Sequence, residues 1–148
     1  MRFISRLLTV FAATATLALA SGGWSDNFEA AKALAKKENK PILLDFTGSD
    51  WCGWCIKLDQ EVFSKREFKA YAKDSLVLVT VDFPHEAHQS KKLKEQNEAL
   101  AKQYGINGYP TIVLIDAEGK KLAATGYKEG GAPAYVEHLK SLLAKKDA

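Results

Sequence analysis

The sequence has few of the residues that define many protein classes. Of its 148 residues only 2 are cysteine, 10 are glycine and 4 are proline. Two cysteines allow at most one intramolecular disulfide, which excludes a disulfide-stapled scaffold. This glycine and proline content, with no low-complexity tract, argues against fibrous repeats and long disordered tracts. The formal net charge is only +3, too small and too scattered to indicate nucleic-acid binding. What remains, 47% hydrophobic and 26% charged residues, is typical of one globular domain.

The first twenty residues differ in composition from the rest. Two arginines precede the run Leu7–Ala20, which carries no charge and ends in the small-x-small sequence Ala-Leu-Ala. This order is typical of a secretory signal peptide and predicts a leader over residues 1–20 and a single domain over residues 21–148. A membrane span would need about 20 apolar residues, so a permanent anchor is the weaker alternative. A buried helix is disfavoured because the run is apolar on every side.

Apolar periodicity predicts alternating helices and strands in the remaining chain. The expected helices cover residues 27–38, 52–62, 64–71, 90–104 and 133–143. Ser25 and Asp26 are the expected caps of the first helix, Ser64 of the third, and Gly105 ends the fourth. The expected strands cover residues 42–46, 76–81, 111–115 and 121–125, the last two as an antiparallel hairpin. This order predicts an α/β fold with a mixed central sheet and helices on both faces.

The segment Trp51-Cys52-Gly53-Trp54-Cys55 carries the clearest chemical signal. Two cysteines three residues apart at the start of a helix place the first sulfur near unpaired backbone N–H groups. Those donors and the helix dipole favour a thiolate on Cys52. Cys55 lies one turn further on, within reach to close a disulfide. We therefore predict that Cys52 is the attacking thiolate and Cys55 the more buried resolving thiol of a dithiol–disulfide exchange.

A second segment, Gly108-Tyr109-Pro110-Thr111, comes directly before a predicted strand. Together with Leu44-Asp45-Phe46, the Trp-Cys-x-x-Cys motif and the hairpin, it resembles the thioredoxin superfamily over most of residues 25–143. The resemblance implies a thioredoxin-like three-layer sandwich. It also implies that Pro110 is cis and holds the Tyr109 backbone open for an extended substrate segment, which would pair as a short added strand.

The resemblance also implies that Asp45 is a buried carboxylate that assists proton transfer at the resolving cysteine. The alternative is that Asp45 caps the end of a strand. The chain departs from cytosolic thioredoxin in its inter-cysteine pair Gly53-Trp54, in a loop before Cys52 that is one residue longer, and in an additional helical segment over residues 61–73. These departures bear on the redox potential and the partner rather than on the exchange chemistry.

Other roles for these residues remain open. Cys52 and Cys55 could form a static disulfide, although such a small loop offers little stabilisation. His85 and His88 could complete a zinc or copper set with the two cysteines, or be solvated loop residues; a protonated His85 could also lower the pKa of Cys52. The flanking Trp51 and Trp54 could form an apolar rim for substrates, or Trp51 could pack on the sheet.

The sequence therefore predicts an enzyme of thiol–disulfide exchange, a reductase or isomerase, that acts on protein thiols and disulfides without a dissociable cofactor or a metal. The leader predicts export, with the bacterial periplasm preferred, where thiols oxidise. A reductase there would need an electron-donating partner, for which we expect a membrane protein that relays reducing equivalents, and we expect the protein to be a monomer. The alternatives are a non-catalytic metal or thiol carrier and, less favoured, a redox-inactive chaperone module.

Overall fold

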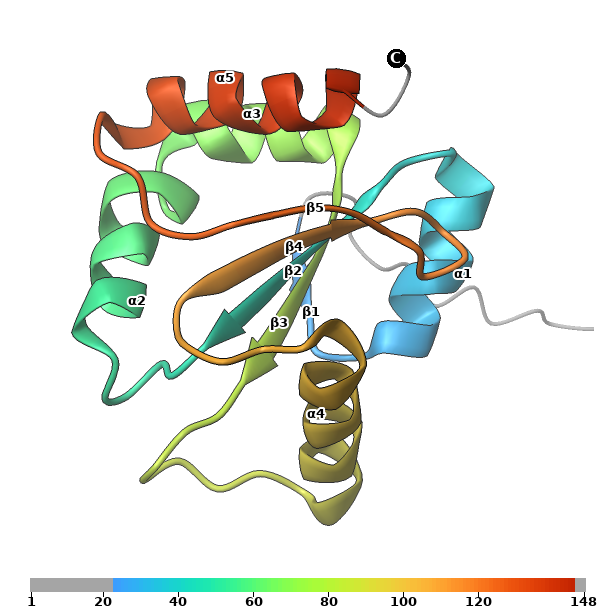
Figure 1. The fold of residues 1–148 in the computed structure, drawn as a ribbon, viewed down its shortest axis with the longest axis vertical. Helices are drawn as coiled ribbons and strands as arrows, with labels where there is room; N and C mark the ends of the chain where they lie inside the picture. The colour runs from blue at the N-terminus through green and yellow to red at the C-terminus, as the bar shows by residue number, and fades with distance from the viewer. Residues whose placement is uncertain (1–22, 146–148) are drawn as a thin grey trace, which may run out of the picture.

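The computed structural model describes residues 23–145. The predicted leader, residues 1–20, lies outside the described residues. Figure 1 shows a sheet with helices around it. The elements in chain order are β1 (Trp24–Ser25), α1 (Phe28–Glu38), β2 (Ile42–Thr47), α2 (Gly53–Leu58), the π-helical segment η1 (Asp59–Phe63), α3 (Arg66–Ser75), β3 (Val77–Asp82), α4 (Lys91–Tyr104), β4 (Thr111–Ile115), β5 (Lys121–Thr125) and α5 (Gly131–Ala144).

The five strands form one mixed sheet in the order β1-β3-β2-β4-β5. Strands β1, β3 and β2 are parallel, whereas β4 runs antiparallel to β2 and to β5. The central strand β2 pairs along its whole length with β3, from Ile42 opposite Val77 to Thr47 opposite Asp82. The predicted α/β sandwich with a mixed sheet is confirmed. Because β2 is flanked on both sides, its carboxyl end is a fixed platform for the loop that follows.

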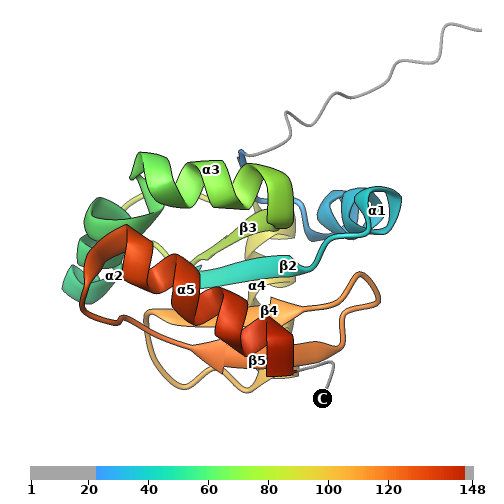
Figure 2. The ribbon, with the colours of Figure 1, turned by 90° about the horizontal axis from the view of Figure 1, so that it is seen from above.

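Side chains of β2 alternate between two hydrophobic cores, since successive residues of a strand point to opposite faces. Ile42, Leu44 and Phe46 lie in the core under α1 and α4. Leu43 lies in the other core, under α2, η1, α3 and α5. Figure 2 shows α3 and α5 side by side on this second face. The same alternation places Asp45, two residues after Leu43, on the face covered by α2 and η1.

Two predicted helix caps are wrong. The first helix is capped by Asn27, whose Oδ1 accepts the N–H of Ala30 at 3.0 Å, because Ser25 is already part of strand β1. The sequence analysis missed β1, which is two residues long and too short for any periodicity. The N-cap of α3 is Lys65; the Ser64 hydroxyl instead donates to the carbonyl of Asp59 at 2.8 Å. Ser64 therefore ends the preceding helix rather than beginning the next.

The helix that follows the cysteine motif changes its pitch. It begins as α2 with Cys52 as N-cap and continues as η1, which ends with the N–H of Ser64 donating to the carbonyl of Asp59. The wider π turn inserts one extra residue, a feature that occurs often at functional sites. Elsewhere the predictions agree more closely: β4 and β5 have the predicted bounds, and Gly105 ends α4 in the left-handed conformation. None of the helices between residues 23 and 145 combines the length and apolarity that crossing a bilayer requires.

We expect the buried core to dominate stability. Leu114 on β4 is fully buried, whereas Leu122 on the edge strand β5 is only partly buried. Leu114→Ala should lower the free energy of unfolding by about 2–5 kcal/mol, because the cavity it leaves cannot collapse. Leu122→Ala, the matched control, should cost only about 1 kcal/mol. Urea unfolding of the oxidised protein measures both values, and equal losses would contradict this packing.

Candidate active site

The two cysteines lie at the start of the helix that follows the central strand β2. Strand β2 ends at Thr47, a four-residue loop follows, and Cys52 is the N-cap of α2. Cys52 and Cys55 are joined as a disulfide with their Cα atoms 5.2 Å apart. The Sγ of Cys52 also accepts the backbone N–H of Cys55 at 3.3 Å. The sulfur of Cys52 therefore sits at the positive end of the helix, where backbone donors favour a negative charge.

In this oxidised state both cysteines are almost covered. Cys52 is 7% exposed and Cys55 is 6% exposed. The exposed fractions therefore do not distinguish an attacking from a resolving cysteine. What distinguishes them is position: Cys52 is the N-cap of α2, whereas Cys55 lies one turn inside the helix and lines a hollow that is open to solvent.

Asp45, which lines the same hollow as Cys55, has a carboxyl oxygen without a hydrogen-bond donor among the described residues. The Oδ1 atom of Asp45 is buried and accepts no hydrogen bond from the described residues. Burial, reinforced by the nearby negative charges of Asp59 and then Asp82, raises the pKa of Asp45 to about 7. A carboxyl group with that pKa can both accept and release a proton near neutrality.

Asp45 and Cys55 line the same hollow, which has a volume of about 390 Å³. Asp59 lines it too, because η1 carries that residue over the end of the sheet. The register of the sheet adds Thr80, directly opposite Asp45 on β3. The hollow thus brings together the buried carboxyl group that the resemblance singled out and the second cysteine. Asp59 was missed, because no motif marks it.

On one side of the motif, Trp51 meets the loop before β4. The Trp51 and Tyr109 rings are 5.7 Å apart in an edge-on arrangement, and Tyr109 also contacts Phe83 at 5.4 Å. The peptide bond between Tyr109 and Pro110 is cis. Trp51 does not pack on the sheet; it is 41% exposed and lies between Tyr109 and the ring of His85. The structure therefore brings the Tyr109-Pro110 segment into contact with Trp51, the residue before Cys52.

On the other side, Trp54 projects from α2 toward solvent and is 57% exposed. Its ring lies 5.0 Å from that of Tyr127, and Lys57 lies over both rings. Gly53 adds no side chain, and a Cβ there would meet nothing within 4 Å. Among the described residues, the large apolar side chains that are exposed are Trp51, Trp54 and Ile56. Exposed apolar surface of this kind marks interaction sites, and here it surrounds the cysteines.

The metal alternative receives no support from this arrangement. Within the part of the chain that the structure describes, no three histidine, cysteine or acidic side chains lie close enough together to hold a metal ion. The ring of His85 stacks on Trp51 with the centroids 4.4 Å apart and nearly parallel. The His85 ring therefore packs against Trp51, and the described structure does not bring the two cysteines and two histidines together as a metal site.

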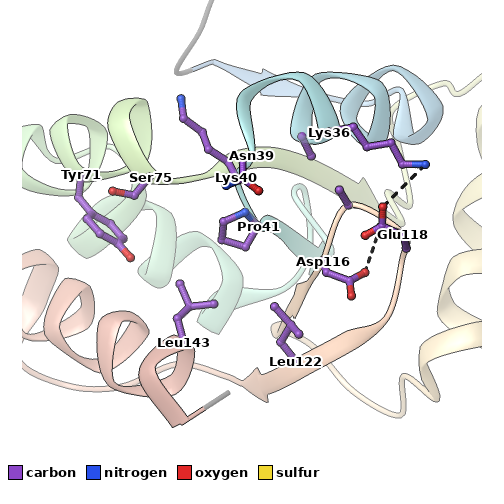
Figure 3. A pocket seen from close by; sticks show the side chains of 12 residues that line it. Lys36, Asn39, Lys40, Pro41, Tyr71, Ser75, Asp116, Glu118, Leu122 and Leu143 are labelled. Atoms are coloured by element: carbon purple, nitrogen blue, oxygen red, sulfur yellow. Dashed lines mark hydrogen bonds and ion pairs between the residues drawn. The ribbon is translucent and has the colours of Figure 1, made fainter. Parts of the chain in front are cut away.

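Another hollow, of about 560 Å³, lies at the opposite end of the sheet (Figure 3). It contains neither cysteine and is lined partly by Pro41, before β2, and Asp116, after β4. Its charged groups already have partners: Lys36 pairs with Glu118 at 3.9 Å, and the N–H of Glu118 donates to Asp116. The chemistry therefore gathers at the cysteine end of the molecule.

Comparison with known proteins agrees with this geometry. The model of a family described as thioredoxin-like domain matches residues 28–139. A Chlamydia pneumoniae protein named Disulfide bond reductase DsbH is 45% identical over 130 residues, which is 88% of this chain and 78% of that protein. A solved structure described as DsbH Oxidoreductase is 41% identical, with a TM-score of 0.80 over 93% of this chain and 95% of that one.

A more distant relative is much longer. A Cronobacter sakazakii protein named Thiol:disulfide interchange protein DsbD is 32% identical over 115 residues, or 76% of this chain. The chain spans only 18% of the length of that protein. The similarity therefore concerns one domain of a larger molecule.

The buried carboxyl group should make stability depend on pH. The pKa of Asp45 is about 7 in the folded protein against an ordinary value of 3.8. Between these two pH values Asp45 is protonated in the folded state but ionised in the unfolded state. The free energy of unfolding therefore falls as the pH rises from about 4 to about 7, and this contribution is constant at higher pH. The difference in the free energy of unfolding between Asp45→Asn and the natural protein should therefore grow by about 2–4 kcal/mol, in favour of the variant, as the pH rises from about 4 to about 8. Urea unfolding of the oxidised forms measures this, and parallel pH profiles would contradict it.

Proposed function

The chain belongs to the family of thioredoxin-like domains, and on that premise we propose that it reduces disulfide bonds of exported proteins through Cys52 and Cys55. The observation that carries the proposal is the bonded cysteine pair at the start of α2, with the Cys52 sulfur accepting a backbone N–H. A sulfur in that position is stabilised as a thiolate, the form that attacks disulfides. The 45% identical relative is named as a disulfide bond reductase, which favours reduction as the direction.

The reaction needs both sulfurs in turn. In the reduced protein, the Cys52 thiolate attacks one sulfur of the substrate disulfide, forms a mixed disulfide and releases the other sulfur as a thiolate. Cys55 then loses its proton and attacks the Sγ of Cys52. This step releases the second substrate thiolate and leaves the Cys52–Cys55 disulfide that the structure contains. Two electrons pass to the substrate. Isomerase-type exchange would begin with the same first step.

Asp45 is the proposed acceptor of the Cys55 proton. It lines the same hollow as Cys55, and its pKa of about 7 suits a general base near neutrality. Asp59 supports this role, since its charge helps to raise the pKa of Asp45. No dissociable cofactor enters the cycle.

The substrate is a protein disulfide rather than a small-molecule disulfide. Trp51 and Trp54 supply exposed apolar surface next to the cysteines in the chain, and Gly53 adds no side chain between them. Tyr109 and Pro110 are the proposed edge against which an extended substrate segment pairs. In an oxidising compartment such as the bacterial periplasm, the enzyme needs a donor to restore its dithiol, and a membrane protein that relays electrons fits that need. Removal of residues 1–20 and a monomeric domain over residues 21–148 belong to the same proposal.

Single-cysteine variants test the order of the two sulfurs. Cys52→Ser should abolish reduction of insulin, because no thiolate remains at the helix start. Cys55→Ser should also stop turnover but accumulate a mixed disulfide with the substrate, since the second attack is lost. Non-reducing electrophoresis and mass spectrometry of the trapped adduct distinguish the two variants. Trapping by Cys52→Ser instead would reverse the assignment, and absence of turnover by the natural protein would remove the proposal.

The pH dependence of the second step tests Asp45. Asp45→Asn should slow resolution of a preformed mixed disulfide by about 10²-fold at about pH 8, where the carboxylate is free to accept a proton. At about pH 5.5 the difference should shrink to about threefold, because only about 3% of a carboxyl group with a pKa of about 7 is then ionised and able to act as a base. Rapid-mixing kinetics followed by acid quench measure the step.

Asp59→Asn is the matched control for that experiment. It keeps the base but removes a charge that raises its pKa, so the midpoint of the pH profile should move down while the maximal rate remains. A rate that Asp45→Asn leaves unchanged at every pH would show that Asp45 is only structural.

A further inference from the structure

Both carboxylate oxygens of Asp50, in the loop before the cysteines, accept hydrogen bonds from the loop of residues 85–87. Oδ1 accepts the backbone N–H of His85 at 2.9 Å, and Oδ2 accepts those of Glu86 at 2.8 Å and Ala87 at 3.0 Å. These bonds lower the pKa of Asp50 to about 2, so the side chain is ionised at any physiological pH. Hydrogen bonds to a carboxylate are shorter and stronger than neutral ones, so three of them hold this exposed loop firmly.

Neighbouring contacts join the same two loops. Asp82, the last residue of β3, accepts the N–H of Ser49 at 2.9 Å and its hydroxyl at 2.6 Å. The N–H of Phe83 donates to the carbonyl of Thr47 at 2.9 Å. Residues 47–50 and 82–87 therefore hold each other by reciprocal bonds. The loop that carries the cysteines does not stand alone.

Both loops contact the side chain of Trp51. Its Nε1–H donates to the carbonyl of Phe83 at 2.7 Å, and the ring of His85 covers one face at 4.4 Å. Gly48 lies against the indole so closely that a Cβ there would sit 2.3 Å from it. Trp51 is thus 41% exposed yet fixed by three separate contacts. An exposed aromatic side chain held in one orientation is preorganised for contact with a partner.

We propose that Asp50 is a positioning residue for protein substrates: by holding residues 85–87 it keeps the His85 ring on Trp51 and so fixes a rigid wall beside Cys52. This inference rests on the proposed function and deepens it. Trp51 precedes Cys52 in the chain and meets Tyr109 edge-on, so the wall lies next to both the attacking sulfur and the proposed substrate edge. A polypeptide that brings its disulfide to Cys52 contacts this wall, whereas a disulfide with small substituents does not.

A different role for Asp50 would leave a different trace. In the alternative role, the negative charge of Asp50, two residues from Cys52, would act only through electrostatics, by disfavouring the Cys52 thiolate. Removing the charge would then change the reactivity of Cys52 toward every disulfide, large or small. The positioning role instead affects the KM for a protein substrate and spares a small one, so the two roles separate experimentally.

The test compares Asp50→Asn with Glu86→Gln, a control that removes a carboxylate from the same loop but keeps all three N–H donors. Each variant is assayed with insulin and with bis(2-hydroxyethyl) disulfide, which is small and uncharged. Asp50→Asn should raise the KM for insulin about fivefold with kcat nearly unchanged, because the wall must now be ordered on binding. Its rate constant with the small disulfide should stay within about twofold of that of the natural protein, and Glu86→Gln should resemble the natural protein throughout.

Two further measurements keep the test decisive. The Trp51 indole hydrogen, identified by its loss in Trp51→Phe, should exchange with solvent about tenfold faster in Asp50→Asn, because its bond to the Phe83 carbonyl depends on the loop. His85→Ala, which keeps the charge of Asp50 but removes the stacked ring, should raise the KM for insulin in the same direction.

Unchanged KM for insulin in Asp50→Asn and His85→Ala would overturn the inference, as would an equal change with both substrates. These results are distinct from failure of the proposed function, in which the natural protein itself does not reduce insulin.

Discussion

The site depends on one interaction, the hydrogen bond from the backbone N–H of Cys55, in the first turn of α2, to the sulfur of Cys52. Strand β2 lies at the centre of the sheet and is hydrogen-bonded along both edges, so its end at Thr47 is fixed. The short loop that follows places Cys52 at the helix start, where its Sγ accepts the N–H of Cys55. Backbone donors in that position favour a negative charge on a sulfur. The scaffold thus provides the electrostatics, and the neighbouring side chains only tune them.

The groups beneath the cysteines act against stability. A carboxyl group at position 45, opposed by the charges of Asp59 and Asp82, costs free energy whenever it is ionised. A purely structural core would place an apolar residue there, as Leu43 does one step earlier on the same face. Natural proteins retain such unfavourable groups where function needs them. The Oδ1 of Asp45, which accepts no hydrogen bond from residues 23–145, and the π-helical turn that carries Asp59 fit the role proposed for this carboxyl group.

The sequence indicated those parts of the molecule that local patterns determine. The buried strands β2, β3 and β4 could be predicted because short apolar runs rich in β-branched residues, bounded by turn residues, are typical of strands buried on both faces. The cysteine motif could be predicted because its chemistry lies within five residues. Strand β1 could not, since its two residues gain their structure only by pairing with β3. Nor could the contacts of Asp59, Tyr127 and Asp50, whose partners lie on other elements and become neighbours only in the folded chain.

The most direct measurement of the central claim is the alkylation rate of Cys52 in the reduced Cys55→Ser variant, which keeps the backbone donor at position 55. Iodoacetamide reacts with the thiolate, so the rate at about pH 6 reports how much of that form the helix start stabilises. We predict that the folded variant reacts at least about tenfold faster than the same variant unfolded in urea. A folded protein that reacts no faster than the unfolded chain would contradict the account.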